Sequence, residues 1–260
     1  MVHLLASGVF FSGFIKDLVC LPRPLSPPLQ RITMSGSAAL EYGFPSTHST
    51  NAVSVAVYAL YLLRSPESAL SDGVNLFLQA ITWLYVTSIV LGRLYCGMHG
   101  FFDVAIGSSL GIILAALHCA FQSSIDQYVQ TGSGKQVFLV VVTILALVRI
   151  HPEPADDCPC FDDSVAFAGV LIGAQVAYWS VARANSVWDS PHPATLPRSR
   201  YENIAWTKMG LRFLIGVLLL FAWRETMKPT LLRALPPVFR GLDKLGLILP
   251  RRFFTNASWV

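Results

Sequence analysis

The chain has 260 residues, 53% hydrophobic and only 13% charged, whereas a soluble globular protein carries about 25% charged residues. Apolar stretches alternate with short segments that hold nearly all the charges, which excludes one large soluble core and favours several membrane spans. The net charge of +4 lies in loops and the C-terminal tail, which excludes a nucleic-acid surface and makes membrane lipids the expected surroundings.

The first apolar segment, Val2 to Ile15, is short for a span, since crossing the hydrocarbon takes about 20 residues. It has neither the positive flank nor the cleavage site of a signal peptide, so we interpret it as the end of a truncated first helix. The proline-rich segment from Pro22 to Pro28 must leave the helix, and the loop runs on to Pro45.

Six more apolar segments follow. We predict helices over Ser46–Leu63, Val74–Leu94, Phe102–Phe121, Val137–Ile150, Ser164–Ala182 and Met209–Trp223. Ser46 is of a residue type that caps helix N-termini. The predicted fold is therefore all-α, a polytopic transmembrane bundle of about seven apolar helices.

The tail from Pro229 differs from these segments. Its apolar and charged residues recur at helical spacing on opposite faces, which is typical of a helix lying in the membrane interface. Pro236, Pro237 and Pro250 interrupt it too often for a span. We therefore predict a transmembrane domain over residues 1–228 and an interfacial tail over residues 229–260.

The five cysteines do not form the framework of a disulfide-rich domain. Three of them, Cys20, Cys96 and Cys119, lie in or beside apolar segments, where a thiol acts as a small hydrophobe. Cys158 and Cys160 stand in a loop without further cysteines or histidines at ligand spacing, so they are a weak zinc signal. The sequence predicts no metal and no cofactor.

Counting each apolar helix as one crossing brings four helix termini to the same face of the bilayer. They carry Lys16, Arg23, His48, Arg93, His99 and Asp103. Charged residues at the ends of spans are costly unless they are solvated or functional. A polar site can form at such a face without moving charge through hydrocarbon.

The three cations of this group suit a phosphate. Arg23 and Arg93 can bind it through two N–H groups at once, and Lys16 acts as a point charge. Ser46 and the free amides at the start of its helix can add neutral donors.

The two histidines suit phosphoryl transfer. His99 and Asp103 are four residues apart, so they share one helix face, and the carboxylate can orient the imidazole as a nucleophile. His48 can protonate the leaving alkoxide as a general acid.

These residues stand in a three-part motif. It reads Lys16, six residues, Arg23-Pro24; then Pro45-Ser46-Thr47-His48; then Arg93, five residues, His99, three residues, Asp103. The motif resembles that of the type 2 phosphatidic acid phosphatase superfamily.

The resemblance implies a helical membrane phosphatase that acts through a phosphohistidine without a metal. It assigns His99 as nucleophile, Asp103 as its orienting partner and His48 as general acid. Its phosphate ligands would be Lys16, Arg23, Ser46 and Arg93.

Two positions depart from the usual family pattern. Thr47 stands where the family usually has glycine, and Gly92 where it usually has serine, which removes one phosphate donor. Thr47 fits the branch of sphingoid long-chain-base 1-phosphate phosphatases, which includes the sphingosine-1-phosphate phosphatases. The segments 95–99 and 151–163 are also similar to that branch, which implies dephosphorylation of long-chain-base 1-phosphates in the endoplasmic reticulum, at a lumenal site.

The charge distribution gives weak support to a lumenal site. The face opposite the site carries Arg64, Lys135, Arg183, Arg198, Arg200 and Lys208. Under the positive-inside rule these cations are cytosolic. Asn256-Ala257-Ser258 would then be a candidate glycosylation acceptor.

Two alternatives stay open. The residues of the motif contact only the phosphate group, so a phosphatidate or polyprenyl diphosphate phosphatase fits the motif equally well. Only segment 151–163 favours a sphingoid substrate. An inactive membrane scaffold or a transporter is the alternative from another class, since transporters also hold charges within membrane helices. The sequence points to no particular oligomeric state.

Overall fold

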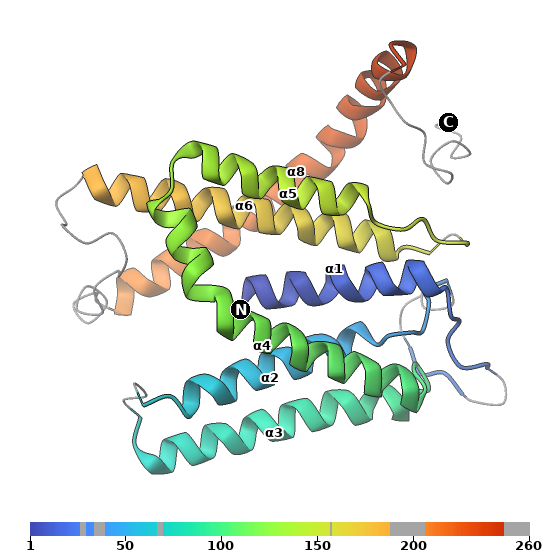
Figure 1. The fold of residues 1–260 in the computed structure, drawn as a ribbon, viewed down its shortest axis with the longest axis vertical. Helices are drawn as coiled ribbons and strands as arrows, with labels where there is room; N and C mark the ends of the chain where they lie inside the picture. Colours follow the sequence, from blue (N-terminus) through green and yellow to red (C-terminus); the bar gives the residue numbers. More distant parts are fainter. Residues whose placement is uncertain (27–29, 34–39, 67–69, 157, 188–205, 247–260) are drawn as a thin grey trace. The chain divides into compact units, whose positions relative to one another are not determined.

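A computed structural model describes residues 1–26, 30–33, 40–66, 70–156, 158–187 and 206–246. These residues form seven helices and no strand. Six helices belong to a first compact unit, residues 1–194, and α8 (Trp206–Lys244) belongs to a second, residues 195–260. The helices of the first unit are α1 (Val2–Val19), α2 (Thr47–Leu63), α3 (Asp72–Tyr95), α4 (Phe101–Thr131), α5 (Gly134–Arg149) and α6 (Cys160–Val187) (Figure 1).

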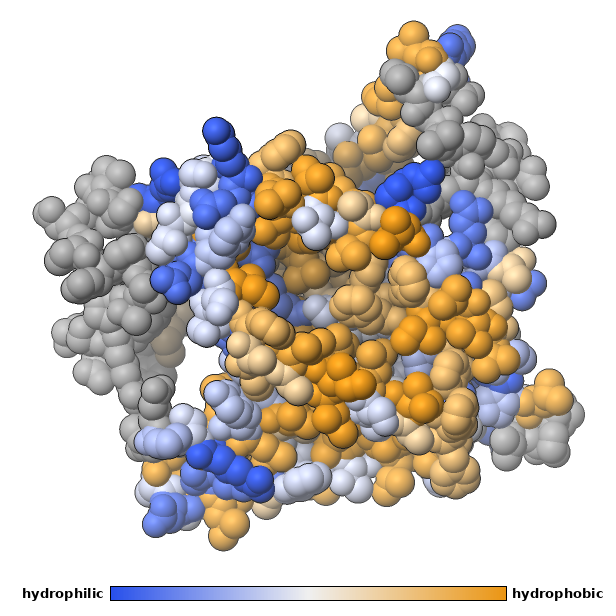
Figure 2. All heavy atoms as spheres, viewed as in Figure 1, coloured by the Kyte–Doolittle hydropathy of each residue, from blue (hydrophilic) through white to orange (hydrophobic). Residues whose placement is uncertain are grey.

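Four of the described helices are long and apolar enough to cross a membrane: α1, α3, α4 and the part of α6 from Cys160 to Arg183. In Figure 2 hydrophobic side chains form a broad band over the helices of the first unit, and hydrophilic ones gather towards the ends of these helices. On α3, Leu76 and Leu84 are each 70% exposed, as expected of side chains that face lipid. The chain is therefore a multi-pass membrane protein.

Helix α2 is the centre of the first unit. It packs against α1, α3 and α4, while α1 also packs against α6 and α6 against α5 (Figure 1). The buried face of α2 carries small residues such as Ser49, Ala52 and Ala56, which allow neighbouring helices to approach closely.

Two glycines of α4 let its backbone touch α2. A Cβ added at Gly107 would lie 2.6 Å from the carbonyl oxygen of Ser46, and one at Gly111 would lie 2.4 Å from that of Thr50. The Thr50 hydroxyl donates a hydrogen bond to the Gly107 carbonyl at 2.9 Å. These contacts fix the start of α2 against the first turns of α4, where the predicted catalytic residues lie.

The loop that follows α1 and the loop that precedes α2 run beside each other, and the second of them also contacts the start of α4. The Gly43 amide donates to the Leu21 carbonyl at 2.8 Å, and the Ser46 amide donates to the Asp103 carbonyl at 3.0 Å. A Cβ at Gly43 would meet the Pro22 carbonyl oxygen at 2.9 Å, so the close approach requires glycine there.

Several predicted helix bounds are wrong. Helix α1 continues past Ile15 to Val19 and, with 18 residues, is among the candidate spans, so it was wrong to expect too short a segment. Helix α4 continues past Phe121 to Thr131.

The largest difference concerns α8. This helix runs on past Trp223 to Lys244, with Pro229, Pro236 and Pro237 inside it. The predicted domain boundary between residues 228 and 229 therefore falls within one helix. An interfacial position for the tail stays a prediction, and Pro250 and the sequon at Asn256 lie outside the described residues.

Candidate active site

The first cation comes from the last turn of α1. Lys16 is 6% exposed, and its side chain lies near Arg23, Glu41 and Asp163. Helix α1 ends just beyond it, where Cys20 takes a left-handed conformation at φ 54° and donates its amide to the Lys16 carbonyl. Ending there turns the chain towards the loop that carries Arg23.

Arg23 joins the loop to the start of α4. One terminal nitrogen donates to the Met98 carbonyl at 3.0 Å and lies 3.3 Å from Nε2 of His99. The other forms an ion pair with the Glu41 carboxylate at 2.5 Å. Burial and the neighbouring Arg31 and Arg93 lower the pKa of the guanidinium, whereas Glu41 raises it. Arginine stays charged under all these influences.

His99 is held by a backbone carbonyl. Its Nδ1 lies 2.8 Å from the Gly43 carbonyl oxygen. A carbonyl only accepts, so Nδ1 carries the proton, and the lone pair is on Nε2 beside Arg23. Burial, followed by the charges of Arg23 and Lys16, lowers the pKa of His99 to about 3. The imidazole is therefore neutral near pH 7, as a nucleophile must be.

Asp103 lies farther from the imidazole than the sequence predicted. Its Oδ2 is 3.8 Å from Nδ1 of His99 and accepts a hydrogen bond from the Gly100 amide at 2.7 Å. The carboxylate thus caps the first turn of α4. The orienting hydrogen bond predicted for Asp103 is made by the Gly43 carbonyl, and the Asp103 carboxylate lies farther away, at 3.8 Å from the neutral imidazole.

His48 and Thr47 open α2. The His48 side chain is exposed to the cavity that His99 also lines, so the two predicted catalytic histidines come together. The Thr47 hydroxyl accepts a hydrogen bond from Ser12 at 2.9 Å, and Thr47 lines the same cavity.

Two predicted phosphate ligands lie beside the cavity rather than in its wall. Ser46 is the N-cap of α2, as predicted, but it is fully buried and accepts hydrogen bonds from the amide and hydroxyl of Ser49. Arg93, at the end of α3, is half-buried, and its charge lowers the pKa of His99. Neither side chain is among those that line the cavity.

The cavity has a volume of about 300 Å³ and carries charges of both signs. Its polar lining consists of Lys16, Arg23, Glu41, Thr47, His48, Asn51, His99 and Asp163. Its apolar lining includes Val9, Ala52, Tyr85, Ile89 and Phe167. An anionic group and an apolar chain can both be accommodated there.

Sequence reasoning missed four residues of this site. Glu41 and Gly43 stand just before the second motif. Asp163 lies in segment 151–163, which was used only as a similarity to the sphingoid branch. Asn51, one turn after His48, was read as part of an apolar helix. The spacing from His48 to Asn51 is the one signal that could have placed an amide on the same face.

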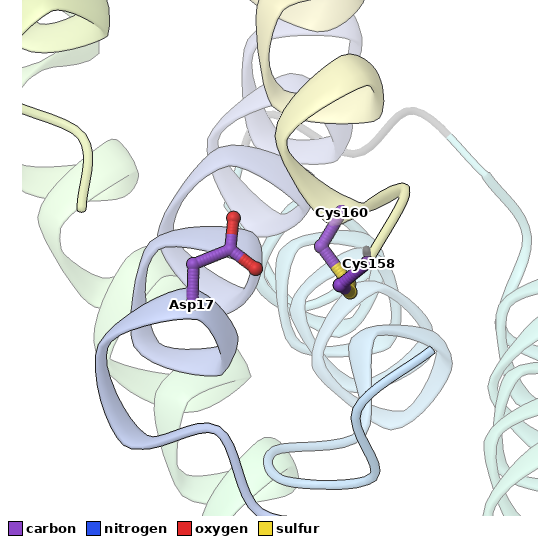
Figure 3. A group of neighbouring side chains, drawn as sticks. All are labelled: Asp17, Cys158 and Cys160. Carbon is purple, nitrogen blue, oxygen red and sulfur yellow. A yellow bond between two sulfur atoms is a disulfide. The ribbon is translucent and has the colours of Figure 1, made fainter. Parts of the chain in front are cut away.

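A second polar cluster lies behind the cavity, between α1 and α6. Asp17, Cys158 and Cys160 have their ligand atoms within 4.8 Å of one another (Figure 3), the single group of metal-like spacing among the described residues. The two sulfurs are joined in a disulfide, which the sequence had not predicted, so they are not free thiolates here. Nearby, His151 contacts Ser164 at 3.1 Å and Asp17 at 3.7 Å. Through these contacts the loop before α6 packs against α1.

Known proteins resemble the chain over these residues. A family model described as "PAP2 superfamily" matches residues 1–125, which include all three motifs. The chain is 39% identical to a dihydrosphingosine 1-phosphate phosphatase of Schizosaccharomyces pombe, over 96% of this chain and 59% of that protein. It is 33% identical to one of Saccharomyces cerevisiae, over 88% of this chain and 54% of that protein.

More distant similarity extends to animals. Sphingosine-1-phosphate phosphatase 2 of Mus musculus is 25% identical over 96% of this chain and 71% of its own length. The chain spans between half and three fifths of the two yeast relatives. No solved structure matches the chain.

Proposed function

We propose that this chain, which the PAP2 superfamily model matches over residues 1–125, removes the phosphate group from sphingoid long-chain-base 1-phosphates through a phosphohistidine. The observation that carries the proposal is the neutral His99, which lines the cavity together with the buried cations Lys16 and Arg23 and has its Nε2 beside Arg23. The names of the yeast and mouse relatives support the sphingoid substrate.

The first half of the reaction forms a bond between Nε2 of His99 and phosphorus. As the bond from phosphorus to the lipid oxygen breaks, His48, which the bound phosphate dianion keeps protonated, gives its proton to the leaving alkoxide. Lys16 and Arg23 neutralise the phosphoryl oxygens, as phosphoryl transfer requires. The proton on Nδ1 stays bonded to the Gly43 carbonyl, which stabilises the positive charge that develops on the ring.

The second half releases phosphate. The neutral His48 takes a proton from water, and the resulting hydroxide attacks the phosphorus of phosphohistidine. The bond to Nε2 breaks, inorganic phosphate forms, and both histidines return to their starting states. No step needs a metal or a cofactor.

The substrate chain is expected between the helices. Tyr85 and Ile89 of α3 and Phe167 of α6 line the cavity beside the charged residues, so an apolar chain can lie there while the phosphate reaches Lys16 and Arg23. We place the protein in the endoplasmic reticulum membrane with the site on the lumenal side. The cations of the opposite face and the branch resemblance support that orientation.

The test is phosphate release by membranes that hold the full chain, with chelator present. We expect faster release from a long-chain-base 1-phosphate than from phosphatidate or a polyprenyl diphosphate. Faster release from either of the latter would overturn the substrate assignment. Membranes that contain the folded chain but release phosphate from none of the three would instead favour an inactive scaffold or a transporter.

A further inference from the structure

The cavity contains two carboxylates that the phosphatase reaction does not use. Glu41 and Asp163 line the same space as Lys16, Arg23 and His99. A carboxylate repels a phosphate dianion, so a cavity built for phosphate alone is weakened by both. Their presence calls for a positively charged group on the ligand.

The two carboxylates differ in their partners. Glu41 forms the ion pair with Arg23 and is neutralised by it. Asp163 lies in the first turn of α6, near the charge of Lys16, but its carboxylate forms no hydrogen bond or close ion pair with any other residue that the structure describes. A residue in a first turn is also favoured by the helix dipole. Asp162 shares that advantage but does not line the cavity.

A third acceptor points to the same need. Asn51 lines the cavity from α2, and its Oδ1 atom is buried against Gly8 of α1 without a hydrogen-bond partner among the described residues, so the amide must turn to present this oxygen to the cavity. A buried acceptor without a donor costs free energy until a ligand supplies one. A nearby positive charge is enough to stabilise a carboxylate, whereas this neutral oxygen needs an N–H or O–H donor.

We propose that Asp163 and Asn51 form a subsite for the ammonium group of an amino lipid phosphate. The inference rests on the proposed function and deepens it. In a long-chain-base 1-phosphate the amine is bonded to the carbon next to the one that carries the phosphate ester. Phosphate held by Lys16 and Arg23 therefore brings the ammonium to the same cavity, where Asp163 supplies the opposite charge and Asn51 an acceptor.

Glu41 completes the subsite when phosphate binds. Phosphate and Glu41 compete for the same guanidinium of Arg23, so phosphate binding releases the Glu41 carboxylate into the cavity. The released charge then lies beside the ammonium. Phosphatidate carries no amine, so Lys16 and Arg23 alone must offset the repulsion between its phosphate and the carboxylates of Asp163 and Glu41.

The experiment compares two substrates of equal chain length, a sphingoid-base 1-phosphate and an alkyl phosphate without the amine. Both are assayed with the full chain and with Asp163→Asn and Asp162→Asn. Wild type is expected to prefer the amine, and Asp163→Asn to lower kcat/KM for the amino substrate roughly 10- to 100-fold. The alkyl phosphate, which has no amine, should lose much less of its kcat/KM in Asp163→Asn than the amino substrate does. Asp162→Asn should leave the preference intact.

Each outcome decides the proposal. An equal loss on both substrates with Asp163→Asn, or an equal loss of preference with Asp162→Asn, would overturn the ammonium subsite. A wild-type chain that hydrolyses both substrates equally would also overturn it and leave the phosphatase in place. A wild-type chain that hydrolyses neither would overturn the proposed function itself.

Discussion

At the scale of single residues, the site depends on a histidine that is kept neutral and correctly turned. Burial and the charges of Arg23 and Lys16 hold the pKa of His99 near 3, and the Gly43 carbonyl fixes its tautomer. The motif spacing identified the histidine. It could not identify a backbone carbonyl as the orienting group, because a carbonyl leaves no mark on the residue type.

Arg23→Gln is expected to change the pH dependence of kcat/KM. Removing the cation beside Nε2 raises the pKa of His99, so protonation disables the nucleophile at a higher pH. The acid limb of the kcat/KM profile should therefore move to higher pH, and the maximum value of kcat/KM should fall. Arg64→Gln, at the far end of α2, is the control and should leave the limb in place. An Arg23→Gln profile of unchanged shape would contradict the role given to this charge.

Gly43→Ala is expected to displace the orienting carbonyl. The added Cβ would meet the backbone of Pro22 and Arg23 at 2.9 Å, and backbone cannot move aside as a side chain can. We expect kcat to fall about 10- to 100-fold with a smaller change in KM, because the misoriented nucleophile acts in the transition state. Gly73→Ala adds a methyl group in open space and should leave kcat and KM unchanged. A normal kcat in Gly43→Ala would show that the imidazole is oriented by other groups.

At the scale of helices, the contact between α2 and α4 positions the site. The N-cap at Ser46 and the apolar segments were readable from the sequence, and both agree with the structure. The positions at which α4 and α8 end could not be read from the sequence. The last turns of α4 are polar, so hydropathy gives no sign that the helix continues, and Pro236 and Pro237 are residues that usually end a helix.

Gly107→Ala tests that contact. Its Cβ would lie 2.6 Å from the Ser46 carbonyl oxygen, so α4 must move away from the start of α2. We expect a loss of about 1–3 kcal/mol of stability, typical of overpacking, and reduced activity. Thermal unfolding in detergent, followed by tryptophan fluorescence, measures it. Gly173→Ala on α6 meets nothing within 4 Å and serves as control, so an equal melting temperature in the two variants would contradict close packing at Gly107.

At the scale of the whole molecule, counting membrane crossings predicted that the three motifs meet at one end of the helices. The structure brings Lys16, Arg23, His48 and His99 to one cavity, as expected. Counting could not predict Glu41 or Asp163. Each depends on how a loop or a distant helix end packs against α1, and no local periodicity encodes that. In the proposed subsite, these unexpected carboxylates distinguish an amino lipid phosphate from phosphate alone.

The central claim is that His99 carries the phosphoryl group. Membranes with the full chain are given a long-chain-base 1-phosphate labelled with radioactive phosphorus, quenched in alkali, which preserves phosphohistidine, and digested. The account predicts label on the peptide that contains residue 99 in wild type and in His118→Ala, and none in His99→Ala; His118 lies on α4, outside the cavity. Label that persists in His99→Ala, or that appears on another peptide in wild type, would contradict it.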